Sequence, residues 1–146
     1  MAFVTPIIDR TQADVLYAII NQNSVSDLKG ALNISDINRI INNSIYLRDL
    51  LIANGFTPSF LNQSLFIETD IPSITSKIDV IRDNVRTLVN SFYTLNNPTI
   101  TYGNTLNYND INIIENNILI TNSLLQGLIN ELKLCGYTTC GEDIQL

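Results

Sequence analysis

Apolar residues recur three and four positions apart in four stretches of the chain, which is the spacing of helices that each bury one face. The first predicted helix begins near Thr11, with Asp14 three residues later as in a capping box, and ends within residues 21–24. Its apolar stripe is Val15, Ala18 and Ile19, with Leu16 at the edge. The second begins near Asn33 and ends near Asn54, because Gly55 favours the left-handed conformation of a helix C-cap. Its stripe is Ile37, Ile40, Ile41, Leu47 and Leu51.

The third predicted helix follows Pro72 and ends near Tyr93, and the fourth begins near Asn107 and ends near Leu134, before a glycine. Both stripes repeat about every 3.5 residues, which is the seam of a coiled coil or a helix bundle. They consist of Ile74, Ile78, Ile81, Val85, Leu88 and Phe92 in the third helix, and of Ile111, Ile114, Ile118, Thr121, Leu125, Leu128 and Leu132 in the fourth. Glycine inside a helix costs about 1 kcal/mol relative to alanine, so Gly127 predicts the close approach of another helix.

The remaining segments predict less regular structure. Residues 1–8 are expected to form an extended arm and residues 96–104 an irregular loop. Residues 56–70 contain either a short helix that begins at Pro58 or a weak strand, and residues 136–146 a small hairpin or an arm. We therefore predict an all-α fold: a bundle of about four helices with a small C-terminal hairpin or arm, in a single helical domain over residues 1–146.

Two of the predicted helices begin with nearly the same phrase, LNISDINRIINN and LNYNDINIIENN. In each copy an asparagine is the N-cap, an aspartate stands at the third helical position, and two apolar residues form a hydrophobic staple. These helix-start residues are Leu32, Asn33, Asp36 and Ile37 in the first copy, and Leu106, Asn107, Asp110 and Ile111 in the second. Alternatively, Ser35 and Asn109 are the caps and each helix begins two residues later.

The repeated phrase predicts an internal duplication, with half-repeats at about residues 11–72 and 73–146. Convergence on the same capping rules is the alternative. Each copy also carries two asparagines four residues apart on one helix flank: Asn38 and Asn42, and Asn112 and Asn116. We expect these amides to bond to the backbone of a neighbouring loop or helix, and the alternative is an interface with another protein.

Composition narrows the classes of function. Only 15% of residues are charged against 45% hydrophobic, and the net charge of −6 disfavours binding to phosphate backbones or to an anionic membrane. We expect neither nucleic acid nor a membrane as partner, since the chain also lacks an apolar run of transmembrane length and an N-terminal secretion signal. Heavy use of Asn and Ile suggests a low-GC bacterium or its phage.

Candidate chemistry is sparse. The chain has no histidine, the commonest general base and metal ligand, and no glycine-rich phosphate-binding motif. Cys135 and Cys140 are predicted to bound a small loop, as a disulfide or as two thiols, because redox pairs usually have two intervening residues and metal sites four ligands. Asp79 and Asp83 lie among Lys77, Arg82 and Arg86, which predicts a solvated face with local ion pairs. We expect no enzyme activity, cofactor or metal.

The segments NRIINN and NIIENN resemble the DxNRIENN phrase of small structural proteins encoded in the tail modules of phages and prophages of Firmicutes. The stretches FVTPIIDRTQADV, IPSITSKIDVIRDNVRTLVNSFY and LNYNDINIIENNILITNSLL are similar to the start, middle helix and last helix of these proteins, so the likeness covers residues 3–137. Two departures stand out. Ile41 replaces a usual glutamate, and the C-terminal aromatic segment is reduced to Tyr137 and the CGYTTC loop.

The resemblance implies a non-enzymatic virion protein, made in the host cytoplasm and located at the tail, baseplate or fibre. Its partners would be other virion structural proteins, and it would be a homo-oligomer within an assembly. The terminal arms, residues 1–8 and 141–146, are the expected docking elements. A capsid decoration or neck protein is one alternative, and a cytosolic helical regulator or immunity-type binding protein is another.

Overall fold

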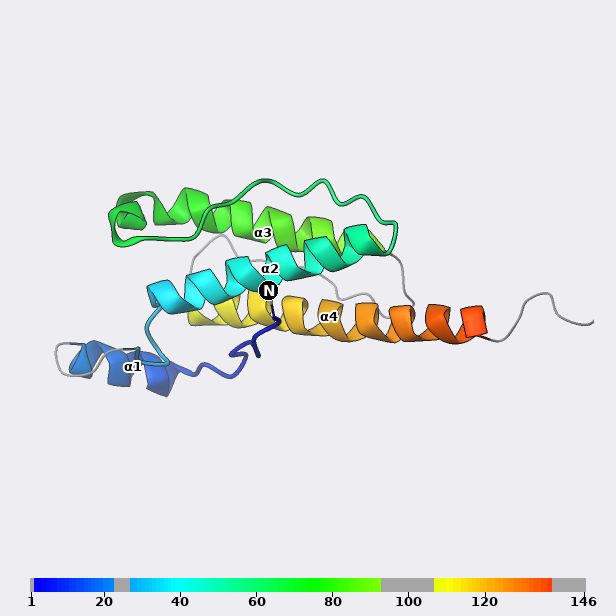
Figure 1. The fold of residues 1–146 in the computed structure, drawn as a ribbon. Helices are drawn as coiled ribbons and strands as arrows, with labels where there is room; N and C mark the ends of the chain where they lie inside the picture. The colour runs from blue at the N-terminus through cyan, green and yellow to red at the C-terminus, as the bar shows by residue number, and fades with distance from the viewer. Residues whose placement is uncertain (1, 23–26, 93–106, 138–146) are drawn as a thin grey trace, which may run out of the picture.

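The computed structural model describes residues 2–22, 27–92 and 107–137 (Figure 1). Within these ranges the chain forms four α-helices and a 3₁₀ helix, with no strand: α1 (Gln12–Asn21), α2 (Ile34–Ala53), η1 (Glu68–Ser73), α3 (Ile74–Asn90) and α4 (Tyr108–Tyr137). The predicted all-α helical bundle is therefore confirmed. The predicted loop over 96–104 and the C-terminal hairpin or arm beyond residue 137 lie outside the described residues.

Helices α2, α3 and α4 pack against one another around a single core (Figure 1). The predicted stripe of α2 is buried throughout, and that of α3 is buried from its second member onward. Side chains that are at most 1% exposed make up the centre of this core: Ile37, Ile40, Ile41, Leu47, Leu51, Ile78, Ile81, Val85, Leu88, Ile114, Ile118 and Leu125. Burial of this apolar surface is the main stabilising contribution to the fold.

The end of α2 shows why the chain turns where it does. Gly55 adopts a φ of +86°, which disfavours residues that carry a Cβ atom. Its N–H donates to Ile52 O at 3.1 Å, and the N–H of Phe56 donates to Leu51 O at 3.0 Å, the hydrogen-bond pair of a Schellman motif. The chain then continues as an extended segment, and neither the short helix from Pro58 nor the strand expected in residues 56–70 forms.

Four expectations for the helices are wrong. Helix α1 buries only Ala18 of its stripe, and Leu16 and Ile19 are 52% and 59% exposed. Helix α3 ends at Asn90 rather than near residue 93, and α4 continues through Gly136 to Tyr137. The stripe of α4 leaves the core before its end, because Leu132 is 54% exposed.

Two glycines, Gly127 and Gly30, differ in the space around them. A Cβ atom added to Gly127 would meet nothing within 4 Å, so this residue does not mark a close helix contact. At Gly30, in contrast, a Cβ atom would lie 2.0 Å from the carbonyl oxygen of Asp14. The turn before α2 thus touches the backbone of α1, and only glycine allows that approach.

Candidate functional site

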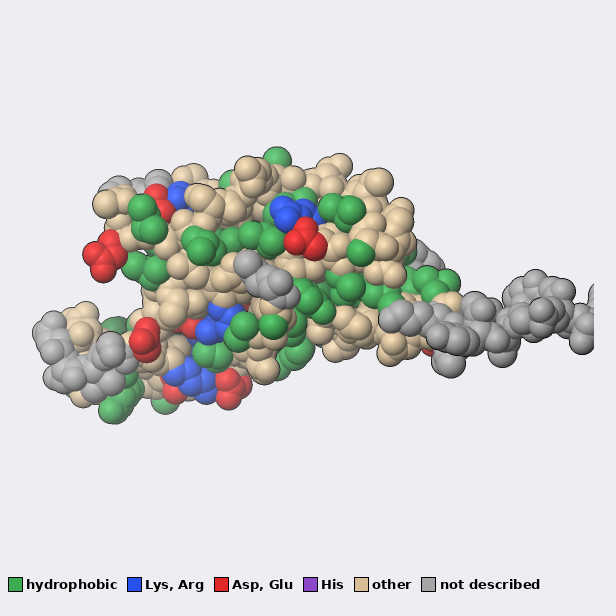
Figure 2. Space-filling view, in the orientation of Figure 1, with side chains coloured by type: hydrophobic (Ala, Val, Ile, Leu, Met, Phe, Trp, Pro, Cys, Tyr) green, Lys and Arg blue, Asp and Glu red, His purple; other side chains and the backbone are tan. Residues whose placement is uncertain are grey.

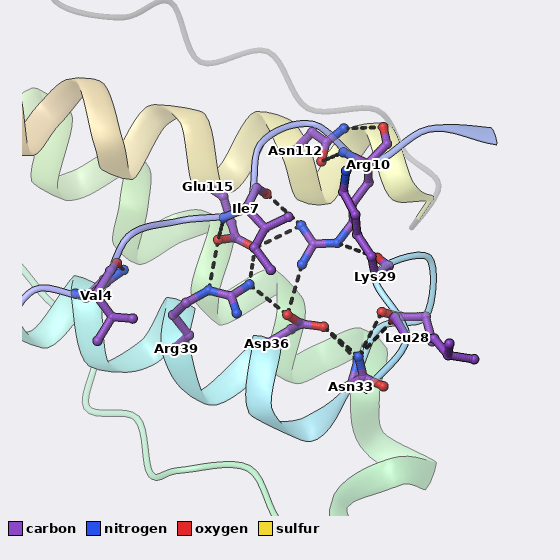
Figure 3. A network of polar contacts seen from close by, with 12 residues as sticks. Val4, Ile7, Arg10, Leu28, Lys29, Asn33, Asp36, Arg39, Asn112 and Glu115 are labelled. Carbon is purple, nitrogen blue, oxygen red and sulfur yellow. Dashed lines mark hydrogen bonds and ion pairs between the residues drawn. The ribbon is translucent and has the colours of Figure 1, made fainter. Parts of the chain in front are cut away.

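Four charged side chains meet in the interior, where the N-terminal arm crosses α2 and α4 (Figure 3). Arg10 contacts Asp36 at 3.0 Å and Glu115 at 2.9 Å, and Arg39 contacts the same two carboxylates at 2.7 Å each. The side chains of Arg10 and Glu115 are 2% and 1% exposed. Charges of opposite sign therefore alternate around a closed, neutral ring, which we call the ion ring.

The ion ring also binds the backbone of the arm. Glu115 accepts a hydrogen bond from the N–H of Ile7 at 2.7 Å in addition to those from the two guanidinium groups. Arg10 donates to the carbonyls of Ile7 at 2.7 Å and Lys29 at 3.2 Å. Because buried charges are costly unless they are paired and hydrogen-bonded, these contacts make the burial tolerable.

Electrostatics within the ring favour the charged state of Arg39. Burial lowers the pKa of Arg39, but the hydrogen bonds and charges of Glu115 and Asp36 together outweigh that effect and raise the pKa above its ordinary value. The stability linked to Arg39 is fully present below the pKa of the unfolded chain and would be lost only as pH rises through the higher folded pKa. The ring thus keeps this cation at any physiological pH.

Four asparagine side chains each hold one residue of an extended segment by two hydrogen bonds. The amide oxygen accepts from that residue's N–H, and the amide nitrogen donates to its carbonyl. In that order the distances are 2.9 and 2.7 Å for Asn43 with Val4, 3.2 and 2.8 Å for Asn112 with Arg10, 2.6 and 3.0 Å for Asn38 with Phe66, and 2.8 and 3.0 Å for Asn84 with Leu61. We call these pairs the asparagine clamps. They fix the arm and the 56–67 segment to the bundle, at a net gain of about 1 kcal/mol per hydrogen bond.

Both copies of the repeated phrase lie at helix starts. Asn107 Oδ1 accepts from the N–H of Asn109 at 2.9 Å and of Asp110 at 3.1 Å, and Asp110 Oδ2 accepts from the N–H of Asn107 at 3.1 Å. In the first copy Asp36 Oδ2 accepts from the N–H of Asn33 at 3.1 Å, while its Oδ1 belongs to the ion ring. The alternative start two residues later is wrong, since α2 begins at Ile34 and α4 at Tyr108.

The structure describes three of the four apolar positions of the two phrases. Ile37 and Ile111 are buried, at 1% and 3% exposure, and Leu32 packs against the core. Leu106 lies outside the described residues.

The predicted amides divide into two kinds. Asn38 and Asn112, at equivalent positions of the two copies, are both clamps, as expected of amides that bond to a neighbouring backbone. The Oδ1 atom of Asn42 is buried without a hydrogen-bond partner among the described residues, and Asn116 is exposed. A direct role in holding the fold therefore belongs to one position of each pair.

The other predicted residues add little to a site. Arg82 contacts Asp79 at 3.3 Å and Arg86 contacts Asp83 at 3.2 Å, and both carboxylates are more than half exposed, as expected for a solvated face. Cys135 lies in α4, while Cys140 falls outside the described residues, so their pairing stays a prediction.

Sequence reasoning missed the ion ring, Asn43 and Asn84. One signal was present: Glu115 occupies the helix position equivalent to Ile41 and lies in a stripe with Ile111, Ile114 and Ile118. A carboxylate in such a stripe must have buried cationic partners. Asn84 likewise lies one position before Val85 on the buried side of α3.

The ion ring is built to hold the chain rather than to react. A general base needs a free lone pair that faces a substrate, whereas Glu115 already accepts from Ile7, Arg10 and Arg39. A cleft of about 540 Å³ beside Arg10 is lined largely by apolar groups, among them Val15, Leu32 and Ile74, and suits an apolar side chain. Across the described residues, no group of three or more Cys, Asp or Glu side chains is arranged to hold a metal.

Comparisons with known proteins add no relative. No protein-family model, curated protein or solved structure matches the chain. No helix in the described part of the chain combines the length and apolarity that crossing a bilayer demands.

Proposed function

We propose that this chain is a non-enzymatic structural subunit of a phage or phage-tail-like particle, at the tail, baseplate or fibre, and that it acts through subunit–subunit contacts. The resemblance of its helix-start phrases and of residues 3–137 to small tail-module proteins supports this class. Such a subunit would be found in the virion, among other virion structural proteins and in several copies.

The observation that carries the proposal is the outer face of α1. Leu16, Tyr17, Ile19 and Ile20 are 52%, 57%, 59% and 79% exposed, although they are neighbours on one ten-residue helix. Contiguous apolar surface of this kind marks a site of protein–protein contact more often than a site of chemistry. We call these four side chains the α1 face.

The arrangement of polar groups supports the same proposal. The ion ring and the asparagine clamps use buried charges and amides to fix the chain's own extended segments. On the surface drawn in Figure 2, few charged side chains interrupt the polar and apolar area. A subunit that occupies one position among neighbours needs fixed segments and low surface charge more than it needs an open polar pocket.

Composition of purified particles tests the proposal. Particles released by the encoding bacterium or phage are separated on a density gradient, and their proteins are quantified by mass spectrometry. We expect this chain in the particle fraction, in a fixed ratio to the other structural proteins. A chain that is abundant in the lysate but absent from the particles would overturn the proposal.

Absence from the particles would favour the second candidate, a cytosolic helical regulator or immunity-type protein. The α1 face also suits that role, because one short helix face is enough to bind a single partner. If the chain is present, electron microscopy of particles that carry a tagged copy distinguishes the tail, baseplate or fibre from a neck or capsid position.

A further inference from the structure

Helix α1, which carries the α1 face, lies at one side of the molecule, apart from the bundle of α2, α3 and α4 (Figure 1). Ala13, Leu16, Tyr17 and Ile20 follow the spacing i, i+3, i+4, i+7, so they form one continuous row on the helix, and Ile19 lies beside it. Ridges of this spacing are the ones that interlock when two helices pack. The face is therefore shaped to receive another helix.

Helix α1 is held firmly enough to present this face. At its start, the N–H and the hydroxyl of Thr11 both donate to Asp14 Oδ2, at 2.8 and 2.7 Å. Lys29 reaches Asp14 at 3.7 Å and Asp9 at 3.0 Å, and Gly30 lies against the α1 backbone. These contacts all lie at the start of the helix or on its inner side, so they leave the outer row free.

Charge decides which partner fits. Asp14 is the only charged residue of α1, and its carboxylate is bonded to Thr11 and Lys29. The chain as a whole carries −6, so two copies would repel through most other surfaces, whereas their α1 faces meet without any charge. A helix that binds an anionic bilayer needs Lys or Arg on its polar side, and residues 12–21 contain neither.

The size of the face sets the strength of the contact. The four exposed side chains offer about 500 Å² per copy, so two copies would bury at most about 1,000 Å², the lower limit of a specific interface. A contact of this size is weak between two free molecules and becomes effective where many copies are held in an array.

We infer that the α1 face is a homotypic docking surface, in which α1 of one copy packs antiparallel against α1 of a second copy about a twofold axis. The inference deepens the proposed function, on which it rests for the array in which the contact operates. Antiparallel packing opposes the two helix dipoles and places the two Asp14 residues at opposite ends of the contact.

Sedimentation of the intact purified chain over a concentration series tests the inference. We expect a monomer–dimer equilibrium for the wild type and at least a tenfold rise in the dissociation constant for Ile20→Asp. Leu132→Asp, which places the same charge on an apolar residue of α4 that is also more than half exposed, is the control and should dimerise as the wild type does. Circular dichroism spectra must show that both variants keep the wild-type helix content.

Three results would overturn the inference: a wild type that stays monomeric at the highest concentration, an Ile20→Asp variant that dimerises normally, or a Leu132→Asp variant that loses the dimer instead. The proposed function fails by a different result, which is absence of the chain from particles. If the wild type is monomeric yet Ile20→Asp is still excluded from particles, α1 binds another virion protein and the proposed function stands.

Discussion

Replacing Glu115 by leucine tests whether the ion ring holds the fold together. The change removes the acceptor of four hydrogen bonds, which come from the N–H of Ile7, from Arg10, and from Nε and Nη2 of Arg39. It leaves two guanidinium groups to share Asp36 and gives the buried site a net charge of +1. A leucine of similar size fills the space. The expected loss of stability therefore comes from the broken ion pairs and hydrogen bonds rather than from a cavity.

The magnitude follows from the burial of the ring. Breaking a buried, hydrogen-bonded ion pair by removing one partner costs about 3–5 kcal/mol, and Glu115 is 1% exposed. At about 2–4 °C per kcal/mol for a chain of this size, the melting temperature should fall by about 10 °C. The double variant Arg10→Met/Glu115→Leu removes one charge of each sign and leaves the Arg39–Asp36 pair. It should therefore lose less stability than the sum of the two single variants.

Urea denaturation followed by circular dichroism measures these differences. Asp79→Asn is the control, because it breaks an ion pair whose carboxylate is 58% exposed and should cost no more than about 1 kcal/mol. The reasoning is refuted if Glu115→Leu costs as little as Asp79→Asn, or if the double variant loses the full sum of the single losses. Either result would mean that the buried charges do not act as one unit.

Three further predictions concern other contacts. Asn112→Ala should cost about 1–3 kcal/mol, because the N–H and carbonyl of Arg10 both lose a partner, and urea denaturation would show no loss if the clamp were unimportant. Gly30→Ala should destabilise the chain, since its Cβ atom meets α1 backbone at 2.0 Å, whereas Gly127→Ala should stabilise it by about 0.5–1 kcal/mol; equal melting temperatures for the two variants would contradict both assignments. Hydrogen bonds from the Thr11 side chain and backbone, together with the charge of Lys29, lower the pKa of Asp14 in the folded chain below its ordinary value of 3.8. The capping contact should therefore be fully present above pH 3.8 and should weaken as the pH falls through the folded-state pKa of Asp14. An NMR titration should show the pKa of Asp14 rising in Thr11→Val, and an unchanged value would refute the cause.

The helices of the core were predictable because their signal is local. The stripes of α2 and α3 place apolar residues three and four positions apart, and residues at that spacing share a face whatever surrounds them. Helix starts are local too: the N–H of Asn107 and the carboxylate of Asp110 meet within one turn. For the same reason, the Schellman ending of α2 could be anticipated from Gly55 alone.

Contacts between distant residues were not predictable in this way. Arg10 and Glu115 are 105 positions apart, and nothing in the sequence pairs them until the arm is laid across α2 and α4. Periodicity also does not say what an apolar stripe packs against. The stripe of Val15, Ala18 and Ile19 was expected to join the chain's own core, yet Ile19 is 59% exposed, because the bundle is already closed by the other three helices.

The structure describes residues 2–8 of the expected N-terminal docking arm, whereas the expected C-terminal arm, residues 141–146, lies outside the described residues. The N-terminal arm was expected to reach a neighbouring subunit, and this role stays a prediction: α2 holds the backbone of Val4 and Pro6 is buried, while the side chains of Val4 and Ile8 are 50% and 40% exposed. The α1 face is one apolar surface that this arrangement leaves uncovered.

Complementation of a deletion strain tests the central claim most directly, because it joins the particle to the α1 face. Particles are purified from a strain that lacks this gene and expresses either the wild-type chain or Ile20→Asp, and incorporation is quantified by mass spectrometry. The account predicts a fixed ratio of wild-type chain to the other structural proteins and a strong loss for the folded variant, with Leu132→Asp incorporated normally. Equal incorporation of Ile20→Asp, or no wild-type chain in the particles at all, would contradict it.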